Sequence, residues 1–299
     1  MIKAEGIIKT FDDFKALDDM SFEVKKGSVY GLVGPNGAGK TTLIKILCGI
    51  YRADSGDILI DGEKVYENTQ IKEKIIYISD ELFFYSTYSI KDMANMYSKI
   101  YPDWSWERYE NMKEIFKIDE NKKVRKLSKG MQKQVAFWLG ISTNPKVMVL
   151  DEPVDGLDPV MRRNVWSLIL SDVSENGTTV LISSHNLREL EDVCDHVGIM
   201  FSGKVVLQKS LDDMKGNIHK IQVAFSDDFS DKLNDELKIL HKSKFGSVIS
   251  MVVKGELEKI NKTINAYKPL IFDILPLTLE EVFIYELGGL GYEFENILL

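Results

Sequence analysis

Glycines and one lysine are concentrated in a short stretch between an apolar segment and a helix-like segment. The letters GPNGAGKTT follow the apolar residues 29–33 and precede an apolar pattern of helical spacing. The spacing Gly-x4-Gly-Lys-Thr in this context is typical of a P-loop, whose backbone N–H groups surround phosphates at a helix start. Lys40 adds a full charge there, and the Thr41 hydroxyl could bind Mg²⁺. The predicted nucleoside triphosphate site consists of Gly34, Pro35, Asn36, Gly37, Ala38, Gly39, Lys40, Thr41 and Thr42.

Two carboxylates close a second apolar run. Residues 147–150 are apolar, and Asp151 and Glu152 follow them directly. A strand that stops there carries Asp151 to the carboxyl edge of a parallel sheet, where its hard oxygen suits Mg²⁺. Glu152 would then be free to act as a base on water. A third apolar run, residues 179–184, ends at His185, so three strands are expected to bring polar groups to one edge.

A second helix start carries residues suited to an anion. Ser128, Lys129 and Gly130 stand where an apolar pattern of helical spacing begins. Serine and glycine at the amino end of a helix form an anion site. One triphosphate does not need two such sites, so the second is expected to bind the γ-phosphate of a nucleotide held by another copy.

The composition excludes several classes of protein. The 299 residues include 46 acidic and 38 basic ones, a net charge of −8. This balance disfavours nucleic-acid binding, which usually needs a basic face. No apolar run reaches the roughly 18–20 residues of a membrane span, and the first residues lack the pattern of a signal peptide. Cys48 and Cys194 are expected to be reduced, buried thiols, and the protein is expected in the cytoplasm.

The pattern of apolar and polar residues changes along the chain, and this change predicts two domains. Short strand patterns fill residues 1–66, helical patterns fill residues 87–142, and strand and helix patterns alternate again to residue 211. The remaining residues, 212–299, have the pattern of a small α+β domain. The predicted fold is α/β: a P-loop core with an antiparallel β-subdomain and a helical subdomain, followed by the smaller C-terminal domain.

The order of these motifs resembles the ATP-binding subunits of ATP-binding cassette (ABC) transporters over residues 2–210. GPNGAGKT resembles the Walker A motif, VMVLDE the Walker B motif and LSKGM the signature usually written LSGGQ. DGLD resembles the D-loop and SSH the switch-histidine motif. A signature between the two Walker motifs is specific to this family, so the resemblance implies an ABC-type P-loop NTPase that uses ATP and Mg²⁺.

The resemblance also implies roles for individual residues. His185 would contact the γ-phosphate, and Asp158 would link two ATP sites across a dimer interface. Phe11 falls where the family stacks an aromatic ring on adenine, with Phe14 as the nearby alternative. The signature contacts to ATP would come from Ser128, Lys129, Gly130 and Met131.

Two departures from the family pattern affect the expected site. Lys129 and Met131 replace a glycine and the glutamine of the signature, while its serine and second glycine remain. The Q-loop glutamine is replaced by Asp80, with Glu81 next to it. Asp80 is expected to approach Mg²⁺ directly or through water, together with Thr41 and Asp151. The alternative is that Asp80 is an ordinary loop residue.

The resemblance implies the ATP-hydrolysing subunit of a transporter, specifically an exporter. Its partners would be a second ATP-binding subunit, identical or different, and an integral membrane permease on whose cytoplasmic side it would lie. Aromatic residues within 80–97 would help to receive a short helix of the permease. The alternatives are a soluble ABC ATPase of translation or DNA repair and a nucleotide-binding regulator with low turnover. The single cassette and the acidic charge disfavour the first, and the presence of both Glu152 and His185 disfavours the second.

Overall fold

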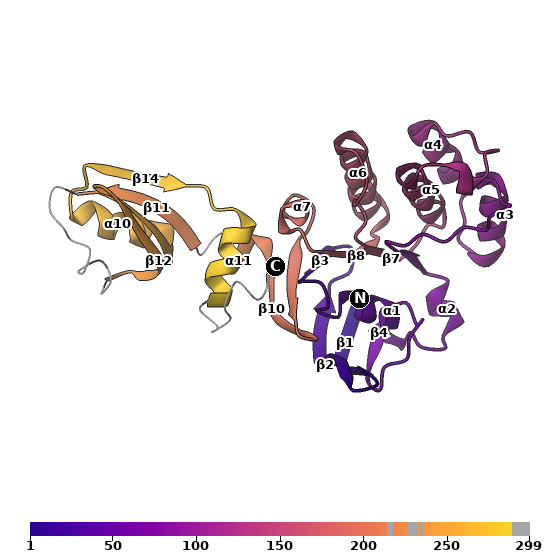
Figure 1. Ribbon diagram of the computed structural model, residues 1–299, viewed down its shortest axis with the longest axis horizontal. Helices are drawn as coiled ribbons and strands as arrows, with labels where there is room; N and C mark the ends of the chain where they lie inside the picture. The colour runs from indigo at the N-terminus through magenta and orange to yellow at the C-terminus, as the bar shows by residue number, and fades with distance from the viewer. Residues whose placement is uncertain (214–217, 226–232, 234–235, 289–299) are drawn as a thin grey trace. The chain divides into compact units, whose positions relative to one another are not determined.

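The chain folds into two compact units (Figure 1). The computed structural model describes residues 1–213, 218–225, 233 and 236–288. Unit 1 comprises residues 1–186 and 193–208, and unit 2 comprises residues 187–192 and 209–299. The sequence pattern predicts that the second domain begins at residue 212. In the structure, the short segment after His185 also groups with the C-terminal unit.

Unit 1 contains two sheets of different character. The antiparallel sheet has the order β2 (Phe14–Val24), β1 (Ile2–Phe11), β4 (Ser55–Ile60), β5 (Glu63–Lys64). The second sheet has the order β10 (Lys204–Ser210), β9 (His196–Phe201), β3 (Val29–Val33), β8 (Thr179–Ser184), β7 (Val147–Asp151), β6 (Ile75–Ile78). The strands from β9 to β6 pair in parallel, so their carboxyl ends meet at one edge. Every residue of β3, β7 and β8 is buried, which explains their continuous apolar runs.

Polar residues cap the longer helices of unit 1. Ser89 and Asp92 form a capping box at α3 (Ile90–Ile100), and Ser105 caps α4 (Trp106–Phe116). Ser128 caps α5 (Lys129–Ser142), and Asp158 caps α6 (Pro159–Asn176). The shorter helical elements are α1 (Lys40–Leu47), α2 (Thr69–Lys72) and η1 (Val124–Lys126).

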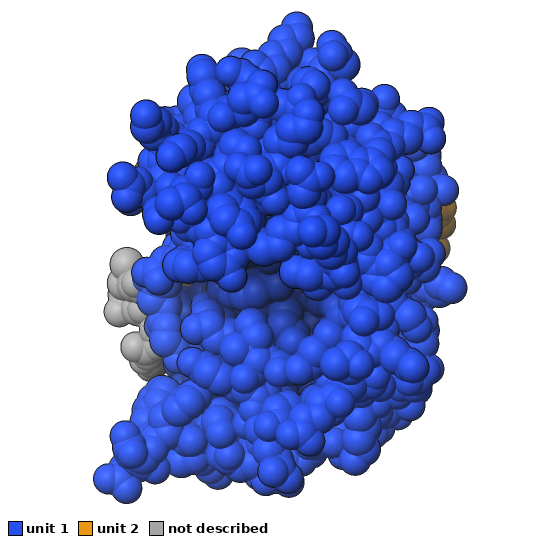
Figure 2. All heavy atoms as spheres, turned by 90° about the vertical axis from the view of Figure 1, so that its right-hand side faces the viewer, with its two compact units in different colours: residues 1–186, 193–208 blue, residues 187–192, 209–299 orange. Residues whose placement is uncertain are grey.

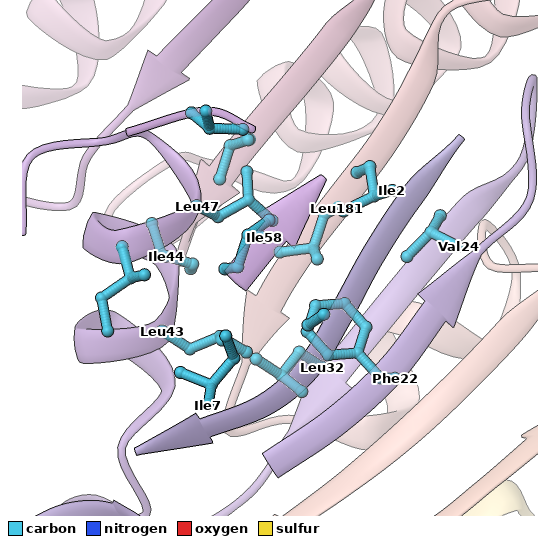
Figure 3. Packing of buried hydrophobic residues seen from close by; sticks show 14 of the residues in the cluster. Ile2, Ile7, Phe22, Val24, Leu32, Leu43, Ile44, Leu47, Ile58 and Leu181 are labelled. Carbon is cyan, nitrogen blue, oxygen red and sulfur yellow. The ribbon is translucent and has the colours of Figure 1, made fainter. Parts of the chain in front are cut away.

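The main hydrophobic core of unit 1 holds the P-loop helix in place. Leu43, Ile44 and Leu47 of α1 are fully buried. They pack in one cluster with residues of both sheets, among them Ile7 of β1 and Leu32 of β3 (Figure 3). Burying a leucine or isoleucine side chain contributes about 1.5–3 kcal/mol. The helix that follows the P-loop is therefore anchored on its apolar side, which limits movement of its amino end.

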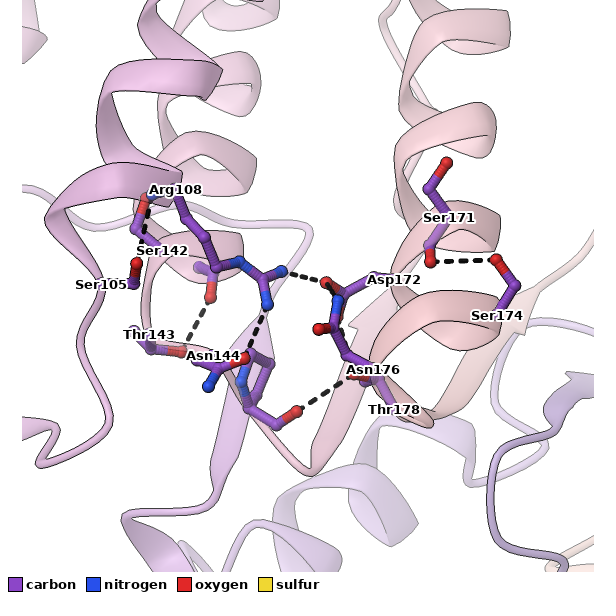
Figure 4. A network of polar contacts seen from close by, with 12 residues as sticks. Ser105, Arg108, Ser142, Thr143, Asn144, Ser171, Asp172, Ser174, Asn176 and Thr178 are labelled. Carbon is purple, nitrogen blue, oxygen red and sulfur yellow. Dashed lines mark hydrogen bonds and ion pairs between the residues drawn. The ribbon is translucent and has the colours of Figure 1, made fainter.

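A buried polar network joins the helical part of unit 1 to α6 (Figure 4). The Arg108 guanidinium of α4 forms an ion pair with Asp172 of α6 and donates to Asn144 Oδ1 at 2.7 Å. Asp172 is 3% exposed and also accepts from Thr178 Oγ1 at 2.7 Å. Because a buried carboxylate without partners is strongly unfavourable, this network fixes α4 against the C-terminal end of α6.

One face of unit 1 is hollowed (Figure 2). The hollow lies between the upper part of the unit, which contains α3, α4 and α5, and the lower part with α1, α2 and β4. The helical subdomain therefore forms one side of a groove in this surface.

Unit 2 is a four-stranded antiparallel sheet with helices. Its strand order is β12 (Lys238–Phe245), β13 (Val248–Lys254), β11 (Ile218–Ala224), β14 (Ile271–Leu275). Ile260 and Ile264 of α10 (Leu257–Ala266) pack on this sheet. The remaining helices include α7 (Leu187–Glu191) and α11 (Leu279–Gly288). The helices α7 and α11 lie in contact, and Arg188 of α7 forms an ion pair with Glu280 of α11 at 3.2 Å.

Candidate functional site

Four parallel strands deliver polar residues to the same edge of the sheet. The P-loop follows β3, and Asp80 lies two residues beyond the end of β6. Asp151 is the last residue of β7, Glu152 comes next, and His185 follows β8. The edge predicted from the three apolar runs therefore exists, and β6 adds a fourth strand to it.

The positions of the three P-loop glycines favour glycine for different physical reasons. A Cβ at Gly34 would collide with the Met200 carbonyl, and one at Gly39 would collide with the Ala16 carbonyl. Gly39 also has a φ of 101°, which favours glycine. By contrast, Gly37 has a φ of 81° and open space where a Cβ would be. Close packing within the protein therefore excludes a side chain at Gly34 and Gly39, whereas a Cβ at Gly37 would point into open space.

The side chain of Lys40 turns back onto the P-loop that precedes it in the sequence. Its ammonium donates to the carbonyls of Gly34 at 2.6 Å and Pro35 at 3.2 Å. The side chain is buried, and this burial lowers the pKa of Lys40, while Glu152 and Asp151 act in the opposite direction. The lysine is thus held at the loop, beside two carboxylates of the same edge.

A cavity of about 320 Å³ lies over the P-loop. Its lining combines backbone N–H groups, the lysine, two threonine hydroxyls and three carboxylates, which is the donor set expected for a phosphate chain with a hard cation. The lining residues are Phe14, Ala16, Pro35, Asn36, Gly37, Ala38, Gly39, Lys40, Thr41, Thr42, Asp80, Asp151 and Glu152.

The aromatic ring at this cavity is that of Phe14, not Phe11. Phe14 is 62% exposed and lines the cavity. Phe11 instead packs edge-to-face on Tyr51, with ring centroids 5.6 Å apart, and has Lys9 Nζ 5.4 Å from its ring centre. Phe11 is 40% exposed, so its stacking on adenine stays a prediction. Phe14, the alternative ring, lines the P-loop cavity.

Asp151 is the most enclosed carboxylate of the site. It is 5% exposed, accepts a hydrogen bond from the Ser183 hydroxyl and lies 3.5 Å from the Tyr77 hydroxyl. Burial raises the pKa of Tyr77 beyond its ordinary value, and Asp151 adds to the shift. These hydroxyls orient the carboxylate at the end of its strand.

Glu152 and His185 lie next to each other and form an ion pair when His185 is protonated. His185 Nδ1 lies 3.0 Å from Glu152 Oε2, and the Glu152 side chain is 16% exposed. Burial raises the pKa of Glu152, and His185 opposes this shift. The contact with Glu152 in turn raises the pKa of His185. A carboxylate with a raised pKa is a stronger base than an ordinary glutamate, which suits a group that takes a proton from water.

Two signature residues, Lys129 and Gly130, line a second cavity. Ser128 accepts from the Met131 N–H at 3.3 Å and so caps the start of α5. The cavity, of about 510 Å³, is lined by Asp80, Glu81, Leu82, Lys129, Gly130, Gln132, Lys133, Asp155 and Gly156. Asp80 lines both cavities and therefore stands between the P-loop and the signature.

Some functional positions have structural partners of their own. The Asp158 side chain accepts from the N–H groups of Val160 and Met161, both at 3.0 Å, and so caps α6. Asp155, the first residue of the DGLD stretch, and Lys133, which no motif singled out, also reach the site. Asp155 lies with Glu152 and His185 in a group whose ligand atoms fall within 4.8 Å of one another. The ammonium of Lys133 donates hydrogen bonds to the backbone carbonyls of Glu152 and Asp155.

Comparison with known proteins agrees with this arrangement. A family model described as "ABC transporter" matches residues 17–155. The ABC transporter ATP-binding protein YtrB of Bacillus subtilis is 33% identical over 289 residues, which cover 97% of this chain and 99% of YtrB. The chain belongs to the ABC transporter ATP-binding family. As members of this family do, the ABC subunit described here binds ATP and hydrolyses it in transport.

Other relatives extend the comparison. The bacitracin transport ATP-binding protein BcrA of Bacillus licheniformis is 34% identical over 218 residues, 72% of this ABC subunit and 71% of BcrA. A solved ATP-binding subunit of an ABC transporter is 25% identical with a TM-score of 0.67, covering 72% of this chain and 92% of that one. The predicted α/β fold with an ABC-type cassette is thus confirmed.

None of the helices in the described part of the ABC subunit combines the length and apolar character that crossing a membrane requires.

Proposed function

We propose that this ABC subunit works as a dimer that encloses ATP between the P-loop of one subunit and the Ser128 end of α5 in the other. The second subunit is, in the simplest case, another copy of this chain. The observation that supports this proposal is that the P-loop and the start of α5 each line a cavity of their own. The helix start capped by Ser128 is the kind of backbone terminus that binds an anion, and a γ-phosphate could use it.

The residues of the P-loop cavity fit a magnesium ion beside the phosphates. Thr41, Asp80 and Asp151 offer hard oxygen atoms, which Mg²⁺ prefers. When bound, the ion neutralises part of the charge of the phosphates. Lys40 would contact the β- and γ-phosphates, and Phe14 would stack on the adenine.

Glu152 and His185 would carry out the hydrolytic step. Glu152 would accept a proton from the attacking water, and its enclosed position supports this role because burial raises its pKa. His185 would contact the γ-phosphate from the end of β8. Asp158, at the start of α6, would link the two sites of the dimer.

The transport function requires an integral membrane subunit, and an exposed aromatic surface supports its docking. Phe83 is 81% exposed, Tyr85 is 48% exposed, and Tyr88 is exposed as well. Their rings contact one another, with centroids 5.8 Å apart for Phe83 and Tyr85 and 5.1 Å for Tyr85 and Tyr88. Such a surface fits a short helix laid into a groove. The similarity to a bacitracin transport protein supports a role in transport. In the proposed function this transport is export, and the subunit lies on the cytoplasmic side of the membrane.

Co-expression with a candidate integral membrane subunit tests the transport assignment. The ABC subunit should then sediment with membranes and release phosphate from ATP faster than when it is expressed alone. Substituting Tyr85 by Ala should reduce the membrane-bound fraction, because an exposed aromatic anchor is lost. If the ATPase rate rises with RNA or DNA and not with the membrane protein, the function is that of a soluble ABC ATPase.

A further inference from the structure

Lys133 lies in the second turn of α5 and is buried although it carries a charge. The residue is 4% exposed. Its ammonium donates to the Glu152 carbonyl at 2.6 Å and to the Asp155 carbonyl at 3.1 Å. Asp80 Oδ1 lies 3.6 Å away and supplies the opposite charge. A buried ammonium without partners is strongly unfavourable, and here its three donors face three acceptor groups.

The backbone that Lys133 holds is that of the catalytic glutamate. Glu152 has a φ of 46°, a left-handed conformation that a residue with a side chain rarely adopts. Its N–H donates to the Ser183 carbonyl at 3.2 Å, and its carbonyl accepts from Lys133. The peptide groups on both sides of Glu152 are thus held by hydrogen bonds. Such a conformation persists only where surrounding contacts determine it.

We propose that Lys133 is a positioning residue for Glu152, and that it makes the signature helix part of the hydrolytic site of its own subunit. The first turn of α5 contains the signature residues, which in the proposed dimer contact the nucleotide of the partner. The second turn holds the loop from Glu152 to Asp155 through one ammonium group. This inference rests on the proposed function for the role of the signature in the partner's site.

The arrangement gives a physical route between the two ATP sites. α5 is a continuous helix from Lys129 to Ser142, so a shift of its first turn moves Lys133 with it. Because Lys133 binds the carbonyls of Glu152 and Asp155, such a shift changes the position of the base. Contact of the signature with the partner's nucleotide therefore changes the position of Glu152, the base that acts on the nucleotide of its own subunit.

Lys133→Met tests the positioning role. Methionine keeps an unbranched apolar chain but removes the ammonium, so the turn at Glu152 loses its carbonyl partner. We expect kcat for ATP hydrolysis to fall about ten- to a hundredfold, as for a misplaced catalytic group. KM for ATP should stay within about twofold, because the P-loop contacts are unchanged. Gln134→Met, one residue further on the same helix, is the control and should leave both values unchanged.

The same substitution in a Glu152→Gln background separates positioning from general damage. If Lys133 acts through Glu152, the double variant should be no slower than Glu152→Gln alone. Its dimer formation with ATP, followed by gel filtration, should also persist. A parental kcat for Lys133→Met, or an additional loss of rate in the double variant, would overturn the inference. A parental rate for Glu152→Gln itself would instead overturn the proposed function.

Chemical footprinting of the parental protein supplies a test that does not depend on folding of a variant. Acetylation followed by mass spectrometry should modify the buried Lys133 at least about tenfold more slowly than Lys129, which lies exposed on the same helix. Equal rates for the two lysines in the native protein would mean that the ammonium of Lys133 does not hold the loop.

Discussion

Glu152→Gln is expected to lower the ATP turnover of this subunit by about two to four orders of magnitude, the usual contribution of a general base. Glutamine has nearly the same shape but cannot accept the proton of the attacking water. The groups that hold the phosphates, Lys40 and the backbone of the P-loop, are unchanged. Bound ATP should therefore remain intact, and the ATP-bound dimer should accumulate.

Two measurements on the same protein check this expectation. Phosphate release gives the turnover, and gel filtration with ATP and Mg²⁺ gives the dimer fraction. Lys40→Ala combined with Glu152→Gln is the control, because a dimer held by ATP should not form when ATP binding is lost. Turnover at the parental rate would remove Glu152 from its role as the base.

Lys40→Ala is expected to weaken ATP binding by about one to two orders of magnitude. The substitution removes a charge-assisted contact with phosphate, worth about 1.5–3 kcal/mol, and each 1.4 kcal/mol corresponds to about a tenfold change in affinity. It also removes a buried ammonium whose own partners, the carbonyls of Gly34 and Pro35, belong to the loop. Isothermal titration with ATP measures the change directly.

Lys45→Ala provides the matched control for this prediction. Lys45 lies on the same helix, α1, but its ammonium faces the ring of Tyr51 at 5.4 Å rather than the P-loop cavity. This variant should bind ATP with the parental affinity. If Lys40→Ala also keeps the parental affinity, Lys40 does not contact the phosphates.

The parts of the site that could be predicted from sequence are those whose residues lie close together along the chain. The P-loop and the Asp151–Glu152 pair each combine a buried strand with the polar residues directly after it. Because such strands run parallel, their ends meet at one edge whatever the details of packing. The cap at Ser128 is local in the same way.

The parts that could not be predicted depend on contacts between distant residues. In the sequence, Lys133 has the pattern of a charged residue on an exposed helix face. In the structure, its carbonyl partners lie 19 and 22 residues away along the chain. Phe11 and Phe14 flank the same turn between β1 and β2, so their spacing does not decide which ring faces the cavity. The grouping of α7 with unit 2 follows from its contact with α11, where Arg188 pairs with Glu280, 92 residues further on.

The central claim is that each ATP site is built from the P-loop of one subunit and the signature of the other. Mixing two inactive variants tests it most directly. Lys40→Ala should lack a working P-loop, and Ser128→Arg should block the signature by filling the helix start with a bulky cation. In a mixed dimer, the P-loop of the Ser128→Arg chain meets the signature of the Lys40→Ala chain, so one site is intact.

The measurement is the ATPase rate of an equimolar mixture of these two variants, compared with each variant alone. We expect the mixture to recover up to about a quarter of the parental rate, because half of the dimers are mixed and each mixed dimer has one intact site of two. A mixture that stays as inactive as its components would contradict the account, since each nucleotide would then depend on the P-loop and signature of a single chain.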